Sequence, residues 1–161
     1  MNASLWPSVA FLTAGALLAP TVGAQTCAAP LPVYPNAGLA GSSCGQNLLP
    51  ALNHGTILMS GDDVVYYVPS SHGESGSAVA TVWTDDPNFH PALFLCSAPC
   101  GSDSQCVSAM DSGTTDRAYV EIPYDENDYY LIVDSQGGCG EYQLGVSGPG
   151  EAPDAGPDAT H

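Results

Sequence analysis

Apolar and polar residues alternate along short segments of the chain, and this period of two constrains the fold more than any other feature. The alternation is clearest in RAYVEIP at 117–123 and EYQLGVS at 141–147. Successive side chains of a strand point to opposite faces, so both segments are typical of strands with one buried and one solvated face. Beyond the N-terminal apolar run, no segment repeats apolar residues at helical spacing over three turns. The sequence therefore predicts an all-β fold.

Other segments are apolar at nearly every position and rich in Val, Tyr, Phe and Trp, which favours strands covered on both faces. They are VVYYV (64–68), AVATVW (78–83), ALFLC (92–96) and YYLIV (129–133), with GTILMS (55–60) as a shorter candidate. Gly, Pro, Asp, Asn and Ser fill the gaps between them, as in turns. Seven or eight short antiparallel strands predict a disulfide-stabilised, jelly-roll-like β-sandwich. We expect residues 126–148 to form its last hairpin, with Cys139 at the tip.

Residues 1–24 have the features of a signal peptide. The apolar run from Val9 to Ala19 is too short to span a bilayer, and Val22-Gly23-Ala24 supplies the small residues that precede a cleavage site. We expect an exported protein, free or held at the cell surface, whose mature chain begins at Gln25 and does not span a membrane. The alternative is a buried N-terminal segment.

Composition divides the rest of the chain into three parts. Residues 25–46 contain several prolines and no apolar period, which predicts an extended strap. Residues 47–148 hold the expected strands and form the sandwich domain. Residues 149–161 are rich in Pro, Asp, Ala and Gly, so they have little apolar surface to bury and predict a disordered tail.

All six cysteines follow the expected cleavage site, at positions 27, 44, 96, 100, 106 and 139. An even number in an oxidising compartment most simply forms three disulfides, and six cysteines allow fifteen pairings. We expect the pairs Cys27–Cys44, Cys96–Cys106 and Cys100–Cys139.

The net charge of −16 comes from seventeen acids and a single cationic side chain, that of Arg117. Such a surface repels phosphate backbones and anionic lipid, which argues against nucleic-acid binding and electrostatic membrane binding. It suits solubility or the capture of cations. Every charged side chain lies at or after Asp62, mainly in expected turns and on outward strand faces.

Three segments together resemble the bacterial pre-peptidase C-terminal domain family, in its cysteine-bearing secreted form. They are GDDVVYYVPSS (61–71), DDPNFHPALFLC (85–96) and DENDYYLIVDSQGGCGEYQLGVSG (125–148). The family has a Gly-Asp-x-x-x-Tyr strand, a following DPxLxL strand and a Tyr-rich closing hairpin, and the likeness covers about residues 55 to 147. It implies a bacterial, jelly-roll-like sandwich appended to secreted enzymes and used for binding or removed. We expect no catalytic domain beside it in this chain.

One segment matches a catalytic pattern in form. GSSCG at 41–45 fits G-x-S-x-G with Ser43 at its centre, but that mechanism needs a strand before the serine and a helix after it. Because a proline-rich segment precedes Ser43, we interpret it as part of a disulfide-flanked loop. The histidines, at 54, 72, 90 and 161, are too far apart to form a local ligand pair. We therefore expect no enzyme and no catalytic residue.

Two metal sites are worth weighing. Zinc could bind Cys96, Cys100, Cys106 and Cys139, since C-x3-C is a permissible spacing, but export favours disulfides. Calcium takes six to eight oxygen ligands and is the more credible cation. Its candidate loops are Asp62-Asp63, Asp85-Asp86 with Asn88, Asp103, Asp111 with Asp116, and DEND at 125–128. None fits an EF-hand, and solvated turn acids, some in Asx-turns, are the simpler interpretation.

Aromatic residues offer a binding surface, because a sandwich strand must point alternate side chains outward. The candidates are Trp83, Tyr66, Tyr67, Tyr119, Tyr124, Tyr129 and Tyr130. The alternative is that they pack in the core and at its rim.

These features favour a secreted, non-enzymatic accessory or binding module that acts on extracellular protein or polysaccharide. Two other functions stay open: a small secreted hydrolase whose site is assembled from loop residues, and a structural spacer or surface-coat component without a ligand. A concave pocket with convergent catalytic groups would favour the hydrolase. Clustered exposed Tyr or Trp would favour the binding module, and a spacer would have neither feature.

Overall fold

The computed structural model describes residues 26–45, 47–49, 53–54, 57–69, 76–97, 100, 106–109 and 116–148. The expected signal peptide and C-terminal tail lie outside these ranges, as do His72, His161, Asp103 and Asp111. The described residues form strands, turns and loops and contain no helix, which confirms the all-β fold.

Eleven strands are described. Their bounds are β1 Leu31–Pro32, β2 Ala37–Ser42, β3 Asn53–His54, β4 Ile57–Leu58, β5 Val64–Val68, β6 Ser77–Trp83, β7 Pro91–Ser97, β8 Cys106–Ala109, β9 Arg117–Pro123, β10 Tyr129–Ser135 and β11 Glu141–Ser147. Those expected from alternation and from fully apolar runs occur within about two residues of the expected positions. The expected strand at 55–60 is only the short β4.

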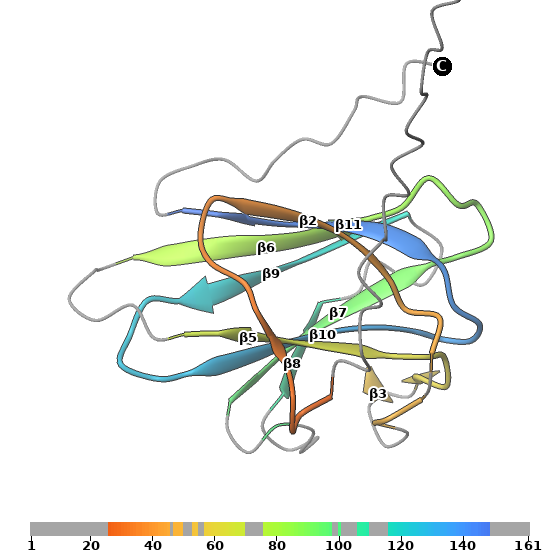
Figure 1. The fold of residues 1–161 in the computed structure, drawn as a ribbon, viewed down its shortest axis with the longest axis horizontal. Helices are drawn as coiled ribbons and strands as arrows, with labels where there is room; N and C mark the ends of the chain where they lie inside the picture. The colour runs from red at the N-terminus through yellow and green to blue at the C-terminus, as the bar shows by residue number, and fades with distance from the viewer. Residues whose placement is uncertain are drawn as a thin grey trace, which may run out of the picture.

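The strands form two facing sheets (Figure 1). One has the order β1-β5-β10-β7-β8 and the other the order β2-β11-β6-β9, while β3 and β4 pair separately. All pairs are antiparallel except β1 with β5. The sandwich is therefore confirmed, with one parallel pair at its edge.

The pairing has the pattern of a jelly roll. Apart from β1, β3 and β4, the first strand pairs with the last, and so on inward: β2 with β11, β5 with β10, β6 with β9 and β7 with β8. A long antiparallel ribbon that folds over on itself produces this nesting, and it yields the two four-stranded layers of a jelly roll.

The expectation of a closing hairpin at 126–148 is wrong. β10 lies in the five-stranded sheet and β11 in the four-stranded sheet, so residues 136–140 cross from one layer to the other. A glycine-rich connection between two apolar strands has the same local sequence in a hairpin and in such a crossing. The partner of each strand is decided by distant segments, β5 and β7 for β10, and β2 and β6 for β11.

The main core fills the space between the sheets. Its buried residues are Val33, Val64, Tyr66, Val68, Ala78, Ala80, Val82, Phe89, Leu93, Leu95, Ala118, Val120, Ile122, Leu131, Val133, Tyr142, Leu144 and Val146. β9 and β11 supply alternate residues to it and keep Tyr119, Glu121, Glu141 and Gln143 outside. The expected one-sided strands are thereby confirmed.

A second apolar cluster covers the other face of the five-stranded sheet. Its buried residues are Met59, Val65, Ala92, Phe94, Cys96 and Ile132, and Cys27, Leu49, Cys100, Cys106 and Tyr130 pack against it. β5, β7 and β10 are therefore apolar on both faces because both faces are covered, as their sequences predict.

The expected strap at 25–46 takes part in the sandwich, since it contributes β1 to one sheet and β2 to the other. β2 has the sequence AGLAGS, which gives no strand signal because glycine and alanine are poor strand formers. The small residue at Gly41 has a packing reason: a Cβ there would lie 2.7 Å from the Tyr142 ring. Tyr142 thus occupies the core beside β2, where its hydroxyl bonds that of buried Tyr66 at 2.8 Å.

Three disulfides join the chain, and one of the expected pairs is confirmed. Cys96–Cys106 links directly opposed residues of β7 and β8. The expected Cys27–Cys44 and Cys100–Cys139 pairs are wrong: the bonds are Cys27–Cys100 and Cys44–Cys139. Cys44 follows β2 and Cys139 precedes β11, so the bond extends the pairing of these two strands by the same register. Because the sequence of β2 gives no strand signal, it does not predict that Cys44 lies beside Cys139.

Removal of the Cys44–Cys139 bond should destabilise the protein more than removal of Cys96–Cys106. The two bonds close loops with sequence separations of 95 and 10 residues, and a longer loop restricts the unfolded chain more. We expect Cys44→Ser/Cys139→Ser to lower the free energy of unfolding by about 4 kcal/mol, roughly 1–2 kcal/mol more than Cys96→Ser/Cys106→Ser. Urea denaturation would measure both, and a smaller loss for the first variant would contradict the expectation.

The tyrosine pair in the core should show coupling. Tyr142→Phe leaves the buried Tyr66 hydroxyl without its partner, so we expect a loss of about 1–2 kcal/mol in the free energy of unfolding. Tyr66→Phe/Tyr142→Phe removes both hydroxyls and should cost less than the sum of the single variants. Additive losses in a double-mutant cycle would show that the two hydroxyls do not interact.

Candidate functional site

We call the outer face of the four-stranded sheet the open face, because several of its described side chains are exposed, whereas an apolar cluster covers the outer face of the other sheet. Tyr119 of β9 is 64% exposed on this open face, and Glu121, Glu141 and Gln143 are exposed beside it. A large aromatic side chain with two acids and an amide is thus presented to solvent by adjoining strands.

Trp83, the last residue of β6, belongs to an inner strand of this sheet. It stands directly opposite Gln143 of β11 on one side and Arg117 of β9 on the other. The benzene edge of its indole passes over Gly145, where a Cβ would lie 3.3 Å from Cζ3 and 3.5 Å from Cη2. The ring therefore leans across β11 in the space that the missing side chain leaves, and it is half-buried rather than projecting freely.

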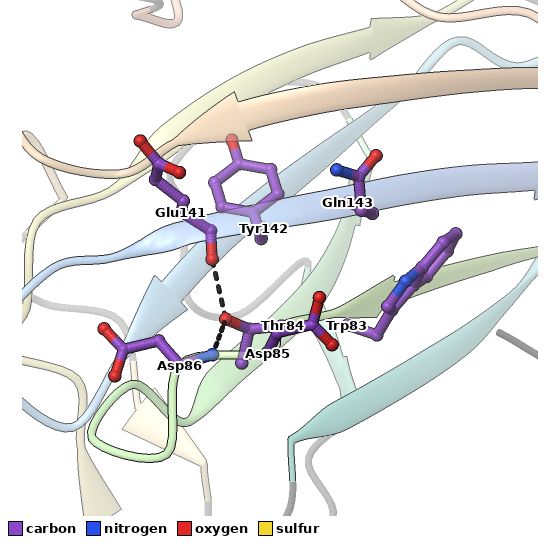
Figure 2. Close-up of a pocket in the computed structure, with 7 residues that line it drawn as sticks. All are labelled: Trp83, Thr84, Asp85, Asp86, Glu141, Tyr142 and Gln143. Atoms are coloured by element: carbon purple, nitrogen blue, oxygen red, sulfur yellow. Dashed lines mark hydrogen bonds between the residues drawn. The ribbon is translucent and has the colours of Figure 1, made fainter. Parts of the chain in front are cut away.

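An open hollow of about 400 Å³ adjoins Trp83 where β6 ends and β11 begins. It is lined by Trp83, Thr84, Asp85, Asp86, Glu141, Tyr142 and Gln143 (Figure 2).

Thr84 holds the two sides of the hollow together. Its hydroxyl donates to the carbonyl oxygen of Glu141 at 2.7 Å and accepts from the backbone N–H of Asp86 at 3.0 Å. The turn that follows is closed by the Asp86 carboxylate, which accepts from the backbone N–H of Asn88 at 2.9 Å. In Figure 2 the indole and the Gln143 amide lie on one side of Thr84 and the Asp86 carboxylate on the other.

The groups at this hollow suit a ligand rich in hydroxyls. An indole offers a flat apolar surface, while carboxylate oxygens accept hydrogen bonds and an amide both donates and accepts. The side chains come from two neighbouring strands and one fixed turn, so the site is largely preformed. Sequence reasoning identified Trp83 but not Gln143 or Glu141, whose positions beside it depend on the β6–β11 register.

The structure separates the other expected aromatic residues. Tyr66 is buried in the main core, whereas Tyr67 and Tyr130 pair on the outer side of the five-stranded sheet with ring centroids 5.8 Å apart. A hydrogen bond to Asp128 raises the pKa of Tyr67. Tyr124 and Tyr129 are partly buried against the main core. The structure therefore brings Trp83 and Tyr119 to one face and divides the remaining tyrosines between core and rim.

Ser43 is a structural residue. It is 1% exposed, its hydroxyl donates to the Gly140 carbonyl at 3.4 Å, and it accepts from the Gly140 N–H at 3.1 Å. These bonds sit beside the Cys44–Cys139 disulfide, in agreement with the interpretation of GSSCG as a disulfide-flanked loop. His90 lies just before β7, and only the backbone of His54 is described, in β3.

The cysteines form disulfides, and the acids of two expected loops, Asp86 and Asp125, bind backbone N–H groups in their own turns. Zinc ligation by four cysteines is wrong, because all of them are in disulfides. The backbone N–H of Asn127 donates to Asp125 at 2.8 Å and lowers the pKa of that carboxyl, so 125–128 contains an Asx-turn. Within the ranges that the structure describes, no three His, Cys, Asp or Glu side chains are grouped to hold a metal. Nor does any helix there have the length and hydropathy of a membrane span.

Comparison with known proteins does not assign the chain to a family. No protein-family model matches the sequence, and no similar protein was found among characterised proteins.

The position of Trp83 should depend on the missing side chain at 145. Gly145→Val would place two methyl groups where the indole lies, so we expect the ring to move into solvent, with a red-shifted emission and stronger iodide quenching. Trp83 is the only tryptophan after residue 24, so its signal is specific in a chain that begins at Gln25.

Gly38→Val is the matched control for this experiment. Gly38 stands directly opposite Gly145 on β2, and a Cβ there meets nothing within 4 Å. The fluorescence of Gly38→Val should match that of the unmodified protein. An equal shift in both variants would mean that valine perturbs the sheet in general rather than the indole.

Proposed function

We propose that the protein is an exported, non-enzymatic module that binds a polysaccharide on the outer face of its four-stranded sheet. Trp83 is the stacking platform for a sugar ring, and Gln143, Glu141 and the turn acids bond its hydroxyls. The observation that carries this proposal is the indole held against Gly145 at the edge of a polar, open hollow. A sugar ring has an apolar C–H face and a polar hydroxyl rim, and this arrangement matches both.

Charge narrows the class of polysaccharide. Asp85, Asp86 and Glu141 surround the hollow, and the whole chain carries a net charge of −16. Sulfated or uronic chains would be repelled, so the ligand is a neutral or amino polysaccharide.

Three disulfides support export, because such bonds persist in oxidising compartments. The likeness of segments 61–71, 85–96 and 125–148 to pre-peptidase C-terminal domains favours an accessory role beside secreted enzymes. The jelly roll is also a frequent architecture of lectin domains, an analogy of fold alone.

Binding should be measured by affinity electrophoresis and pull-down on neutral and amino polysaccharides, after a glycan array has selected a ligand. We expect Trp83→Ala to weaken binding at least tenfold, because a buried stacking contact is lost. Gly145→Val should weaken it as well, and Gly38→Val should not. Tyr34→Ala removes a 57% exposed aromatic residue near Tyr67 of the other sheet and should bind normally.

The same assays separate the other functions. Release of reducing sugar from the bound polysaccharide, lost in Glu141→Gln, would identify a hydrolase instead of a binding module. Binding that survives Trp83→Ala would place the ligand elsewhere. No retention on any glycan would leave the polysaccharide proposal without support and favour the spacer.

A further inference from the structure

A second site lies on the opposite side of the molecule, at the margin of the cluster that covers the five-stranded sheet. Asp63 immediately precedes β5, and Asp134 is near the end of β10, the neighbouring strand. Continuing the Val64–Val133 register places these two acids opposite each other. They lie on the face of Val65 and Ile132, away from the main core. Asp63 is 3% exposed and Asp134 fully buried.

Backbone N–H groups that follow β2 bind the acids that precede β5. The backbone N–H groups of Leu48 and Leu49 donate to Asp63 Oδ2 at 2.8 and 2.7 Å, and that of Gly45 donates to Asp62 Oδ2 at 3.0 Å. Asp134 Oδ1 accepts from the backbone N–H of Ser135 at 2.6 Å. Each buried carboxylate thus has one oxygen satisfied by backbone.

Three side-chain oxygens of the two acids and of nearby Asn47 have no hydrogen-bond partner within the described part of the chain. They are Asp63 Oδ1, Asp134 Oδ2 and the side-chain oxygen of Asn47, and all three atoms are buried. Asn47 adjoins Leu48, whose N–H binds Asp63. A buried oxygen without a partner is costly, and a buried carboxylate more so. The three oxygens belong to residues that are joined by the Leu48–Asp63 hydrogen bond and by the pairing of β5 with β10. Together they indicate that a positively charged group binds between them.

The two acids also repel each other. Burial, with a smaller contribution from the charges of Asp63 and Asp62, raises the pKa of Asp134 to about 7. Opposed like charges on neighbouring strands destabilise a sheet. The sequence contains no lysine, and its one arginine, Arg117, lies on β9 of the other sheet.

We propose that Asn47, Asp63 and Asp134 bind a hard divalent cation, for which calcium is the fitting ion. The donors are two carboxylates and one amide oxygen, the ligand types that calcium prefers, and calcium accepts irregular geometry with water in its remaining positions. Asn47 is essential to the set, because the two aspartates alone do not make a cation cage. The cation would join residues 47–49 to the start of β5 and the end of β10.

Calcium alone tests the site on the full mature protein. The melting temperature in millimolar calcium should exceed that in chelator by about 5 °C or more, and isothermal titration should give one site. Magnesium should act more weakly, because it demands a stricter octahedron. An unchanged melting temperature with no heat of binding would overturn the proposal.

Matched variants locate the effect. Asp134→Asn keeps the shape and removes a charge, so it should weaken calcium binding at least tenfold, whereas Asp125→Asn, at a carboxylate in an exposed Asx-turn, should not. Asn47→Asp adds a third carboxylate, so it should strengthen the calcium response and lower stability in chelator. This gain keeps the test decisive if Asp134→Asn fails to fold.

A shared proton is the competing explanation for two opposed acids. It would stabilise the protein as the pH falls from about 7 towards 4, because the folded state would hold the proton more tightly than the unfolded state. Stabilisation by acid with no response to calcium would therefore overturn the cation site. Equal calcium responses in Asp134→Asn and Asp125→Asn would also overturn it.

Discussion

The five-stranded sheet is apolar on both faces, and the rest of the structure follows from the need to cover it. One face is buried by the other sheet, and the second face requires material from outside the sandwich. The chain supplies that cover from the segments around Cys27, Leu49 and Met59 and from the disulfides at Cys96 and Cys100. These segments are short and form few backbone pairs, so covalent bonds hold them where extended strands would otherwise do so.

This arrangement gives the molecule two different sides. On the covered side, backbone amides and carboxylates meet at the edge of an apolar cluster, where unpaired oxygens are costly and where we propose a cation site. On the open side, the four-stranded sheet faces solvent and shows Trp83, Tyr119 and several polar groups. The acidity of the chain acts differently on the two sides: it favours a cation on one and repels anionic ligands from the other.

The open side owes its shape to small residues. Gly145 lets the Trp83 indole lie across β11, and Gly41 lets Tyr142 fill the core beside β2. Tyr142 and Gln143 both line the hollow, but the Tyr142 side chain also packs in the main core. A single strand, β11, therefore connects the packing of the sandwich to the side chains of the proposed binding face.

The sequence by itself determined the class of the fold, because alternation and fully apolar runs depend only on which faces of a strand are buried. It also indicated Cys96–Cys106, whose partners are ten residues apart and directly opposed. It did not reveal β2, since a strand of five small residues and Leu39 carries no periodic signal. For the same reason it did not predict that Cys44, which follows β2, pairs with Cys139. Only the tertiary structure decided that β10 and β11 enter different sheets, that Gln143 stands opposite Trp83, and that the backbone of Leu48 and Leu49 binds Asp63. The physical reason is the same in each case: strand pairing is set by distant backbone, and local sequence specifies a strand's faces but not its neighbours.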